Sequence, residues 1–232
     1  ALAACAVRTL GIETSTSQTS VALLEGGQLV LTRAHTRPKQ SAERLLPLIA
    51  ELLAEAGWPR ESLERIGVSV GPGSFTGLRV GLACAQGLSL GLGIPLVGVT
   101  SLQAMARAVP ASIPGLRCAI LDARRGEVFA AAYEAGPRAV QALPPAALPA
   151  VGAHASLSQE LAAPIVWVGS GLGLLNQPAS FSSPETEEPG AFAVGLLAEE
   201  LDPADHPPEP VYIRDVGATL PDLGARSGPR MI

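Results

Sequence analysis

The fold class of this chain is decided by residues 66–99, which read IGVSVGPGSFTGLRVGLACAQGLSLGLGIPLVGV. An apolar run over 66–70 predicts a short buried strand, and a glycine-rich loop separates it from a predicted helix over 77–92. A second apolar run over 95–99 predicts another buried strand. A strand, a helix and a strand in succession are typical of a parallel sheet, so this stretch predicts an α/β fold.

The segments on both sides extend this pattern. Apolar periodicity predicts three further strands and two helices, at 10–14, 19–24, 29–34, 41–56 and 101–108. The pair Gly26–Gly27 predicts a tight hairpin turn between the second strand and the third. The first half of the chain is therefore expected to form a βββαβα unit followed by one more helix.

The second half repeats this order in degraded form. Its predicted strands and helices lie at 118–121, 128–133, 156–163, 165–168 and 191–201, and the proline-rich segment 136–153 is expected to be mostly loop with an edge strand in it. Two such units predict a two-lobed fold whose glycine-containing turns line a cleft. We expect an N-terminal lobe (1–108), a C-terminal lobe (109–202) and a proline-rich tail (203–232) that is extended or partly disordered.

Composition and charge exclude several classes of function. The 232 residues are 47% apolar and 16% charged, with a net charge of −5, so chain-wide attraction to nucleic-acid phosphates is not expected. Aromatic residues make up 3%, too few for a platform that stacks single-stranded bases. Cys5, Cys84 and Cys118 form no CxxC pair and the histidines have no metal-binding spacing, so no metal site is expected and a reducing cytosol fits best.

Residues 80–106 carry no charge and are long enough to span a bilayer. Gln86, Pro95 and several glycines interrupt them, which favours a buried helix, a turn and a buried strand over a membrane span. No signal peptide is evident before Arg8. We therefore expect a cytoplasmic protein without membrane contact.

The loop GPGSFTG, residues 71–77, has the glycine content of a phosphate-binding loop. It lacks the GxxxxGK[ST] order, because the single lysine of the chain is Lys39, and its glycines miss the GxGxxG spacing. A tight turn stiffened by Pro72 is one interpretation, and an anion site at the start of the next helix is the other. The residues that would form such a nucleotide or anion site are Thr14, Ser15, Gly71, Gly73, Ser74 and Asp122. No GxSxG elbow is present, and no catalytic residue is predicted.

The predicted helix over 77–92 has unusually many small residues. They recur every four positions along two rows: Gly77, Gly81, Ala85 and Ser89 in one, and Ala83, Gly87 and Gly91 in the other. Such rows let another element approach closely, although each glycine costs about 1 kcal/mol of helix stability relative to alanine. Packing inside the lobe explains one row, whereas the second row and a wide leucine face over 45–53 suggest a subunit interface. The candidate interface residues are Leu45, Leu46, Ile49, Leu52, Gly77, Arg79, Gly81, Cys84, Ala85 and Leu88.

The stretch GPGSFTGLRVGLACAQGLSLGLGIPLVGVTSL, residues 71–102, closely resembles the signature region of the bacterial TsaB (YeaZ) family. The resemblance continues in LGIETSTSQTSVALLEGG (10–27), SAERLLPLI (41–49) and LDARRGEVFAAAY (121–133). A weaker match is PVYIR (210–214), which is similar to a proline–tyrosine–arginine signature of the family. The resemblance implies the two-lobed fold of actin, Hsp70 and the sugar kinases, with duplicated βββαβα units.

The resemblance also implies a function. Proteins of this family help to transfer a threonylcarbamoyl group to adenosine 37 of tRNAs that read codons beginning with A. By resemblance, this chain is a non-catalytic, activating or scaffolding subunit. It would pair with a TsaD-like catalytic subunit through the helices at 41–56 and 77–92, with a TsaE-like ATPase as a further partner. Self-association through the same helices is also implied, as is contact with tRNA through the complex. No cofactor is required of this chain, and ATP or ADP and metal are expected on the partner subunits.

The chain departs from the family at two places. Glu13 stands where many relatives have aspartate, and Gln40 precedes Ser41 where many have histidine. A longer carboxylate without lysine or histidine ligands nearby makes a kinase site less favourable. Two alternatives remain open at this point: a stand-alone phosphotransferase of the same fold, and a glycoprotease-like peptidase.

Overall fold

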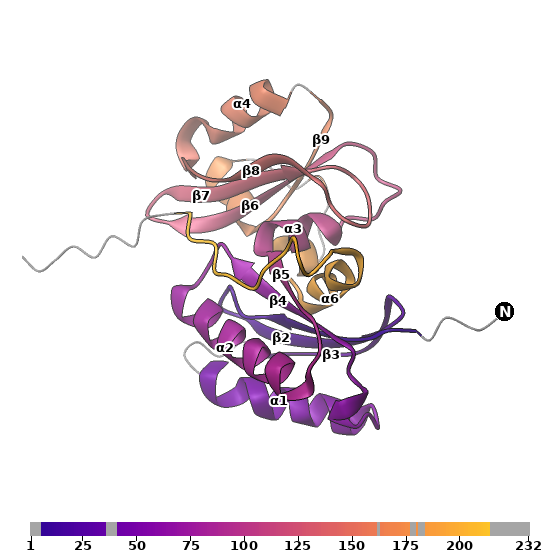
Figure 1. Ribbon diagram of the computed structural model, residues 1–232. Coiled ribbons are helices and arrows are strands. Elements are labelled where there is room, and N and C mark those ends of the chain that lie inside the picture. Colours follow the sequence, from indigo (N-terminus) through magenta and orange to yellow (C-terminus); the bar gives the residue numbers. More distant parts are fainter. Residues whose placement is uncertain (1–5, 36–40, 162, 177–179, 181–183, 214–232) are drawn as a thin grey trace, which may run out of the picture.

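The computed structural model describes residues 6–35, 41–161, 163–176, 180 and 184–213, and they are arranged around two β-sheets (Figure 1). The first sheet is built from Arg8–Glu13 (β1), Thr19–Glu25 (β2), Gln28–His35 (β3), Arg65–Gly71 (β4) and Leu96–Thr100 (β5). Its strand order is β3-β2-β1-β4-β5. The strand β2 pairs antiparallel with β1 and β3, whereas β4 runs parallel to β1 and β5.

The second sheet repeats this plan with one strand fewer. It contains Leu116–Arg124 (β6), Glu127–Tyr133 (β7), Gln141–Pro149 (β8) and Ile165–Val168 (β9). Its order is β8-β7-β6-β9, with two antiparallel pairs followed by a parallel one. This repetition confirms the predicted two-lobed α/β fold of duplicated units, the second of which is degraded.

Helices separate and cover the sheets. They are Ser41–Glu55 (α1), Phe75–Leu92 (α2), Ser101–Arg107 (α3), Ala150–Leu161 (α4), Pro184–Glu187 (α5) and Ala191–Glu200 (α6), with 3₁₀ turns at Arg60–Ser62 (η1) and Ser170–Leu175 (η2). In Figure 1, α1 and α2 cover the outer face of the first sheet, α3 and α6 lie between the two sheets, and α4 covers the outer face of the second.

The helix α6 joins the two halves through a shared core. Its residues Val194 and Leu197 are fully buried in one apolar cluster with residues of both sheets, such as Val99 and Leu121. The helix lies so close to the first sheet that a Cβ atom on Gly11 would be 2.0 Å from the carbonyl oxygen of Ala191. Glycine in the middle of β1 is therefore required by the close approach of α6.

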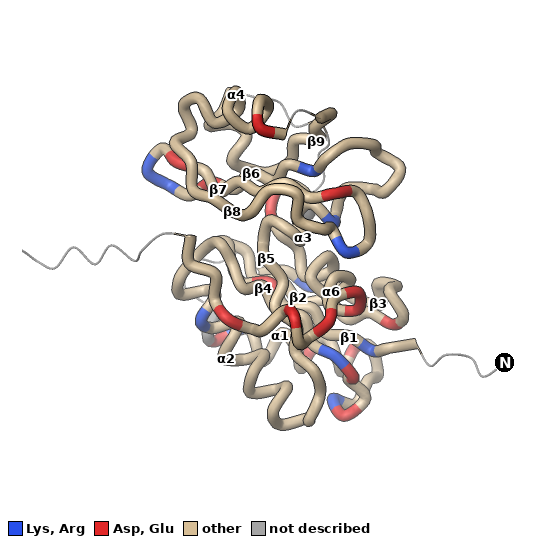
Figure 2. The backbone as a smooth tube through the Cα atoms, turned by 45° about the horizontal axis from the view of Figure 1, so that its top comes forward, with Lys and Arg blue, Asp and Glu red and all other residues tan. Residues whose placement is uncertain are grey.

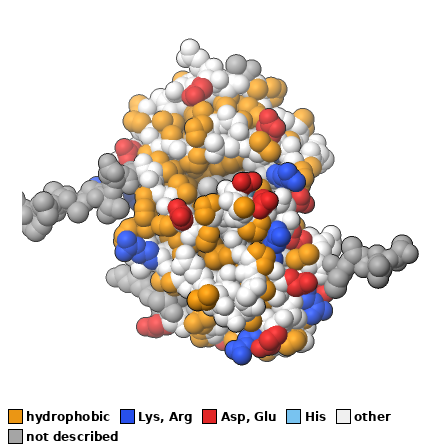
Figure 3. All heavy atoms as spheres, viewed as in Figure 1, with side chains coloured by type: hydrophobic (Ala, Val, Ile, Leu, Met, Phe, Trp, Pro, Cys, Tyr) orange, Lys and Arg blue, Asp and Glu red, His pale blue; other side chains and the backbone are white. Residues whose placement is uncertain are grey.

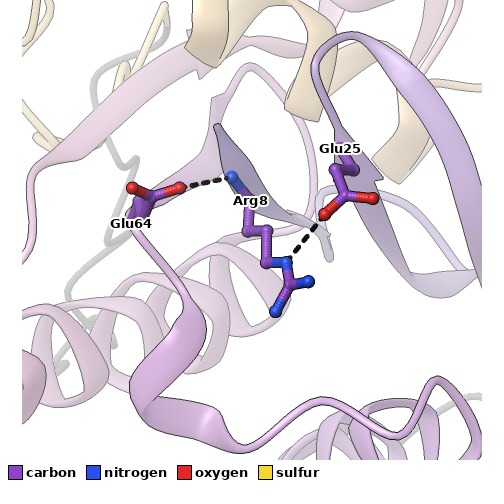
Figure 4. Close-up of polar contacts among 3 residues, drawn as sticks. All are labelled: Arg8, Glu25 and Glu64. Atoms are coloured by element: carbon purple, nitrogen blue, oxygen red, sulfur yellow. Dashed lines mark hydrogen bonds and ion pairs between the residues drawn. The ribbon is translucent and has the colours of Figure 1, made fainter. Parts of the chain in front are cut away.

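Polar contacts fix the start of β1. Figure 4 shows Arg8 between two carboxylates: its backbone N–H donates to Glu64 at 3.0 Å, and its Nε donates to Glu25 at 2.9 Å. The guanidinium carbon of Arg8 lies 4.6 Å from the ring centre of Trp58. These contacts tie β1 to the β2–β3 hairpin and to the segment that enters β4, although an ion pair this exposed contributes under about 1 kcal/mol.

Three predicted elements need correction. The edge strand expected within 136–153 is present, but it is longer than a segment that is mostly loop allows: β8 covers 141–149 and, at the edge of its sheet, tolerates its three prolines, Pro144, Pro145 and Pro149. The helix predicted over 156–163 spans Ala150–Leu161, with non-helical backbone at Val151 and Gly152. The helix α2 begins two residues earlier than predicted, because Ser74 caps its N-terminus by accepting the Gly77 N–H at 3.2 Å.

The uncharged stretch over 80–106 does not form one long span. It is divided between α2, the turn at Gly93, β5 and the first six residues of α3, so the predicted helix, turn and strand are present. In the part of the chain that the structure describes, no helix has both the length and the apolar character needed to cross a membrane.

Candidate functional site

The glycine-rich loop before α2 is packed against the segment that follows β1. The Ser74 N–H donates to the Ser15 carbonyl oxygen at 2.6 Å, and a Cβ atom on Gly73 would lie 2.1 Å from the same oxygen. Thr14 and Ser15 are each 1% exposed. The structure therefore brings five of the six candidate anion-site residues together, but the Ser74 N–H and the N–H of the neighbouring Gly77 are already satisfied within the chain.

Asp122, the sixth candidate, lies at the end of β6 on the second sheet. Its carboxylate accepts hydrogen bonds from the backbone N–H of Arg124 at 2.7 Å and from the Arg124 guanidinium at 3.2 Å. Both residues belong to the β6–β7 hairpin, so these contacts are local to the turn. The turn interpretation accounts for the contacts of Asp122 and of the loop.

Glu13 is the buried acid next to this loop. Its side chain has no exposed surface, one carboxylate oxygen accepts the Ser15 N–H, and the other has no hydrogen-bond partner among the described residues. Burial raises the pKa of Glu13 to about 7, although the hydrogen bonds to Ser15 oppose the shift. The nearby Glu188, before α6, also has a pKa raised by burial. Sequence reasoning missed Glu188, because a residue so distant along the chain gives no local signal.

The chemistry of this region depends on the carboxyl group of Glu13, because burial favours its protonated, uncharged form. A magnesium–nucleotide complex needs ionised carboxylate oxygens that are free to coordinate the ion or its waters. One oxygen of Glu13 is engaged by its own chain, and the burial of its carboxyl favours the proton. Within the described residues, no three His, Cys, Asp or Glu side chains are placed to hold a metal ion.

The raised pKa of Glu13 predicts a dependence of stability on pH. The folded protein binds this proton more tightly than the unfolded chain, so the stabilising contribution is complete below pH 4.5 and is lost as the pH rises to about 7. The loss is on the order of 3 kcal/mol for a shift of this size. Urea unfolding of wild type between about pH 5 and pH 8 is expected to show this decline, and Glu13→Gln is expected to flatten it. If the free energy of unfolding changed equally with pH in the two proteins, Glu13 would not be the group with the raised pKa.

The inner row of small residues on α2 packs inside the lobe. Gly77, Gly81 and Ala85 are buried, and a Cβ atom on Gly77 would lie 2.0 Å from the Thr14 carbonyl oxygen. Six of the candidate interface residues are buried inside the lobe, on the inward-facing sides of α1 and α2, and are not part of the surface: Leu45, Ile49, Leu52, Gly77, Gly81 and Ala85. The hydrophobic periodicity identified the helices but not which of two apolar faces points inward.

The outer row of α2 faces away from the fold. Residues at successive fourth positions are all exposed: Phe75, Arg79, Ala83, Gly87 and Gly91. A Cβ atom added to Gly87 or Gly91 would meet no atom of the described residues within 4 Å. We call these five residues the outer row. Arg79 is the only charged residue of α2, which is tan along most of its length in Figure 2.

Two large apolar side chains of α1 and α2 are also exposed. Leu90 on α2 is 86% exposed, and Leu46 on α1 is 55% exposed. Cys84 and Leu88, two further candidates, are half-buried and pack partly against the core of the lobe. Figure 3 shows apolar side chains over much of one face of the molecule, with several of the charged side chains gathered at the right of the view. The candidate surface thus consists of the outer row with Leu46 and Leu90, and sequence reasoning missed Phe75 and Leu90.

Comparisons with known proteins give one consistent result. A family model described as "TsaD: tRNA N6-adenosine threonylcarbamoyltransferase" matches residues 34–187. The chain is 32% identical over 229 residues to the tRNA threonylcarbamoyladenosine biosynthesis protein TsaB of Escherichia coli (strain K12), covering 90% of this chain and 95% of that protein.

A solved structure and a second relative extend the comparison. The structure of YeaZ from Pseudomonas aeruginosa has a TM-score of 0.71 at 28% identity, covering 89% of this chain and 99% of that one. The tRNA N6-adenosine threonylcarbamoyltransferase of Solidesulfovibrio magneticus is 39% identical over 110 residues, which cover 41% of this chain and 30% of that protein. The chain is therefore similar over nearly its whole length to proteins of one kind, and over a shorter part to a transferase.

Proposed function

The chain belongs to the TsaB (YeaZ) family, and from this premise we propose that it works as a non-catalytic subunit that binds and activates a partner enzyme. It acts in tRNA threonylcarbamoyladenosine biosynthesis. The partner is a TsaD-type catalytic subunit, which transfers the threonylcarbamoyl group to tRNA. The proposed docking surface is the outer row of α2, with Leu90 of the same helix and Leu46 of α1.

The observation that carries this proposal is the outer row itself. Glycine inside a helix is unfavourable, and in the part of the lobe that the structure describes no atom lies within 4 Å of a Cβ position on Gly87 or Gly91. A close-packed partner helix accounts for glycine there. The exposed Leu90 beside the row supplies apolar surface of the kind found at the centre of interfaces.

Further partners are proposed from the resemblance to the TsaB (YeaZ) family. We place a TsaE-like ATPase and the tRNA on the assembled complex, with ATP or ADP and metal held by the other subunits. A homodimer through the same helices would compete with the TsaD-type partner, because both would cover the outer row. The process acts on tRNA, and we therefore place the protein in the cytoplasm.

Mixing the purified chain with the TsaD-type subunit of the same organism tests the proposal. We expect a one-to-one complex in size-exclusion chromatography and a measurable dissociation constant in calorimetry. Absence of a complex both with and without ATP would contradict the proposed function.

Nucleotide binding by the chain alone is expected to be absent. Burial favours the protonated form of Glu13, and one of its carboxylate oxygens is engaged by Ser15, so this acid offers little to a magnesium–nucleotide complex. Calorimetry with millimolar ATP and magnesium is expected to give no binding heat. Saturable binding that Glu13→Gln removes would favour the stand-alone phosphotransferase instead.

A further inference from the structure

The segment that follows α6 returns to the first sheet and crosses the start of α2. In Figure 1 it is the yellow-orange trace that runs from α6 past β5 toward α2. The His206 carbonyl accepts the Gly98 N–H of β5 at 2.9 Å, and the Val211 N–H donates to the Val70 carbonyl of β4 at 2.7 Å. The side-chain amide of Gln86, on α2, donates to the Pro208 carbonyl at 3.3 Å. We call residues 206–213 the C-terminal strap.

A glycine in the first sheet allows the strap to pack closely against β5. A Cβ atom on Gly98 would lie 2.4 Å from the Pro207 carbonyl oxygen, so only glycine lets the strap approach β5 this closely. Val211 and Ile213 pack against the two apolar cores, whereas Tyr212 between them is 41% exposed. This part of the predicted tail is therefore extended and held in place, and Tyr212 points outward; residues 214–232 lie outside the described residues.

Tyr212 meets the first two residues of the outer row. Its ring centre lies 5.4 Å from that of Phe75, which is itself 40% exposed. The Arg79 guanidinium carbon lies 3.9 Å from the centre of the Phe75 ring, and Arg79 Nε is 3.5 Å from the Tyr212 hydroxyl oxygen. Two aromatic side chains, one from α2 and one from the strap, thus hold the guanidinium of Arg79.

Contacts with Phe75 and Tyr212 hold the Arg79 side chain in place, but no acidic side chain among the described residues pairs with its charge. Among the residues that the structure describes, it forms no ion pair, although five other arginines do. An arginine stacked on aromatic rings at the edge of an apolar surface is typical of the few residues that dominate binding energy. Its planar fork matches a carboxylate, and stacking fixes it before a partner arrives, which lowers the entropy lost on binding.

We propose that the C-terminal strap belongs to the docking surface, and that Tyr212 positions Arg79 to bind a carboxylate of the TsaD-type partner. This inference rests on the proposed function, since it names a group that the partner must present. The facing surface of the partner is apolar with one acidic side chain opposite Arg79, because α2 offers a single charge at the head of a row of small residues. Tyr212 acts through Arg79 and is a positioning residue.

Affinity for the TsaD-type subunit, measured by calorimetry at several salt concentrations, tests this inference. Arg79→Ala is expected to weaken binding about ten-fold or more and to remove most of the salt dependence, because an exposed ion pair is screened. Tyr212→Ala is expected to give a similar loss, and Tyr212→Phe, which keeps the ring, to stay within about two-fold of wild type. The double variant Arg79→Ala/Tyr212→Ala is expected to bind about as well as Arg79→Ala alone, because the two residues act as a unit.

Val151→Ala is the matched control, since Val151 is 94% exposed on the far side of the second sheet. Thermal unfolding of each variant separates a loss of folding from a loss of binding. If Tyr212→Ala does not fold, the affinity and salt dependence of Arg79→Ala still test the inference. Wild-type affinity in Tyr212→Ala, or a salt dependence that Arg79→Ala leaves intact, would overturn the inference.

A further variant, Gly87→Glu, separates this inference from the proposed function. If Gly87→Glu blocks binding while Arg79→Ala and Tyr212→Ala do not, the outer row is the docking surface and the role of the strap is wrong. A wild-type chain that forms no complex would overturn the proposed function and this inference with it.

Discussion

Gly87→Glu is expected to abolish binding to the TsaD-type subunit while leaving the fold intact. A Cβ atom at position 87 would meet no atom of the described residues within 4 Å, so we expect glutamate to be accommodated there as a solvated surface residue. In the complex, the same carboxylate would be buried without a partner against a close-packed helix. The penalty for an uncompensated buried charge is about 3–5 kcal/mol, which corresponds to a loss of affinity of at least about a hundred-fold.

Val151→Glu is the control for this experiment. Val151 is 94% exposed and belongs to α4, on the outer face of the second sheet, so the same change of charge is made far from α2. Calorimetry is expected to give wild-type affinity for Val151→Glu and no detectable binding for Gly87→Glu, with unchanged thermal unfolding of both. Equal affinity of the two variants would show that the outer row is not the docking surface.

Alanine at the inner and outer rows of α2 is expected to change stability in opposite directions. At Gly77 the new Cβ would lie 2.0 Å from the Thr14 carbonyl oxygen, so the helix must move away from the backbone that it packs on. Overpacking of this kind costs about 1–3 kcal/mol. At Gly87 the Cβ has free space, and alanine is favoured over glycine in a helix by up to about 1 kcal/mol.

Urea unfolding of the free chain measures both changes. Gly77→Ala is expected to lower the free energy of unfolding and Gly87→Ala to raise it, a separation of about 2–4 kcal/mol between two identical substitutions on one helix. A stabilising Gly77→Ala would contradict the close packing of the loop on Thr14, because such a change requires free space at the Cβ position.

The sequence predicts the fold well, because both lobes are built from local patterns. Apolar runs and glycine turns located nearly every strand. The hairpin was predicted from the pair Gly26–Gly27, and both glycines have the positive φ that such a turn requires. The edge strand β8 was harder to predict because its prolines break the usual strand pattern, and only its position at the edge of the sheet makes them acceptable.

The candidate site could be predicted only in part. Periodicity found both rows of small residues on α2, but the close contact of Gly77 with Thr14 decides which row is inside, and that contact is tertiary. The meeting of Phe75 with Tyr212 joins residues far apart in the chain, so no local pattern reveals it. The PVYIR signature was visible in the sequence, but its place beside α2 was not.

The central claim is that this chain supplies a surface to the complex and leaves the chemistry to its partner. The most direct test is the initial rate of threonylcarbamoyl transfer to tRNA by the reconstituted complex that carries Glu13→Gln and Ser15→Ala in this chain. Neither change touches the outer row, so binding is retained, and we predict a rate within about two-fold of wild type. Loss of a group that takes part in the chemistry costs about a hundred-fold or more. A fully assembled complex with a loss of that size would contradict the account.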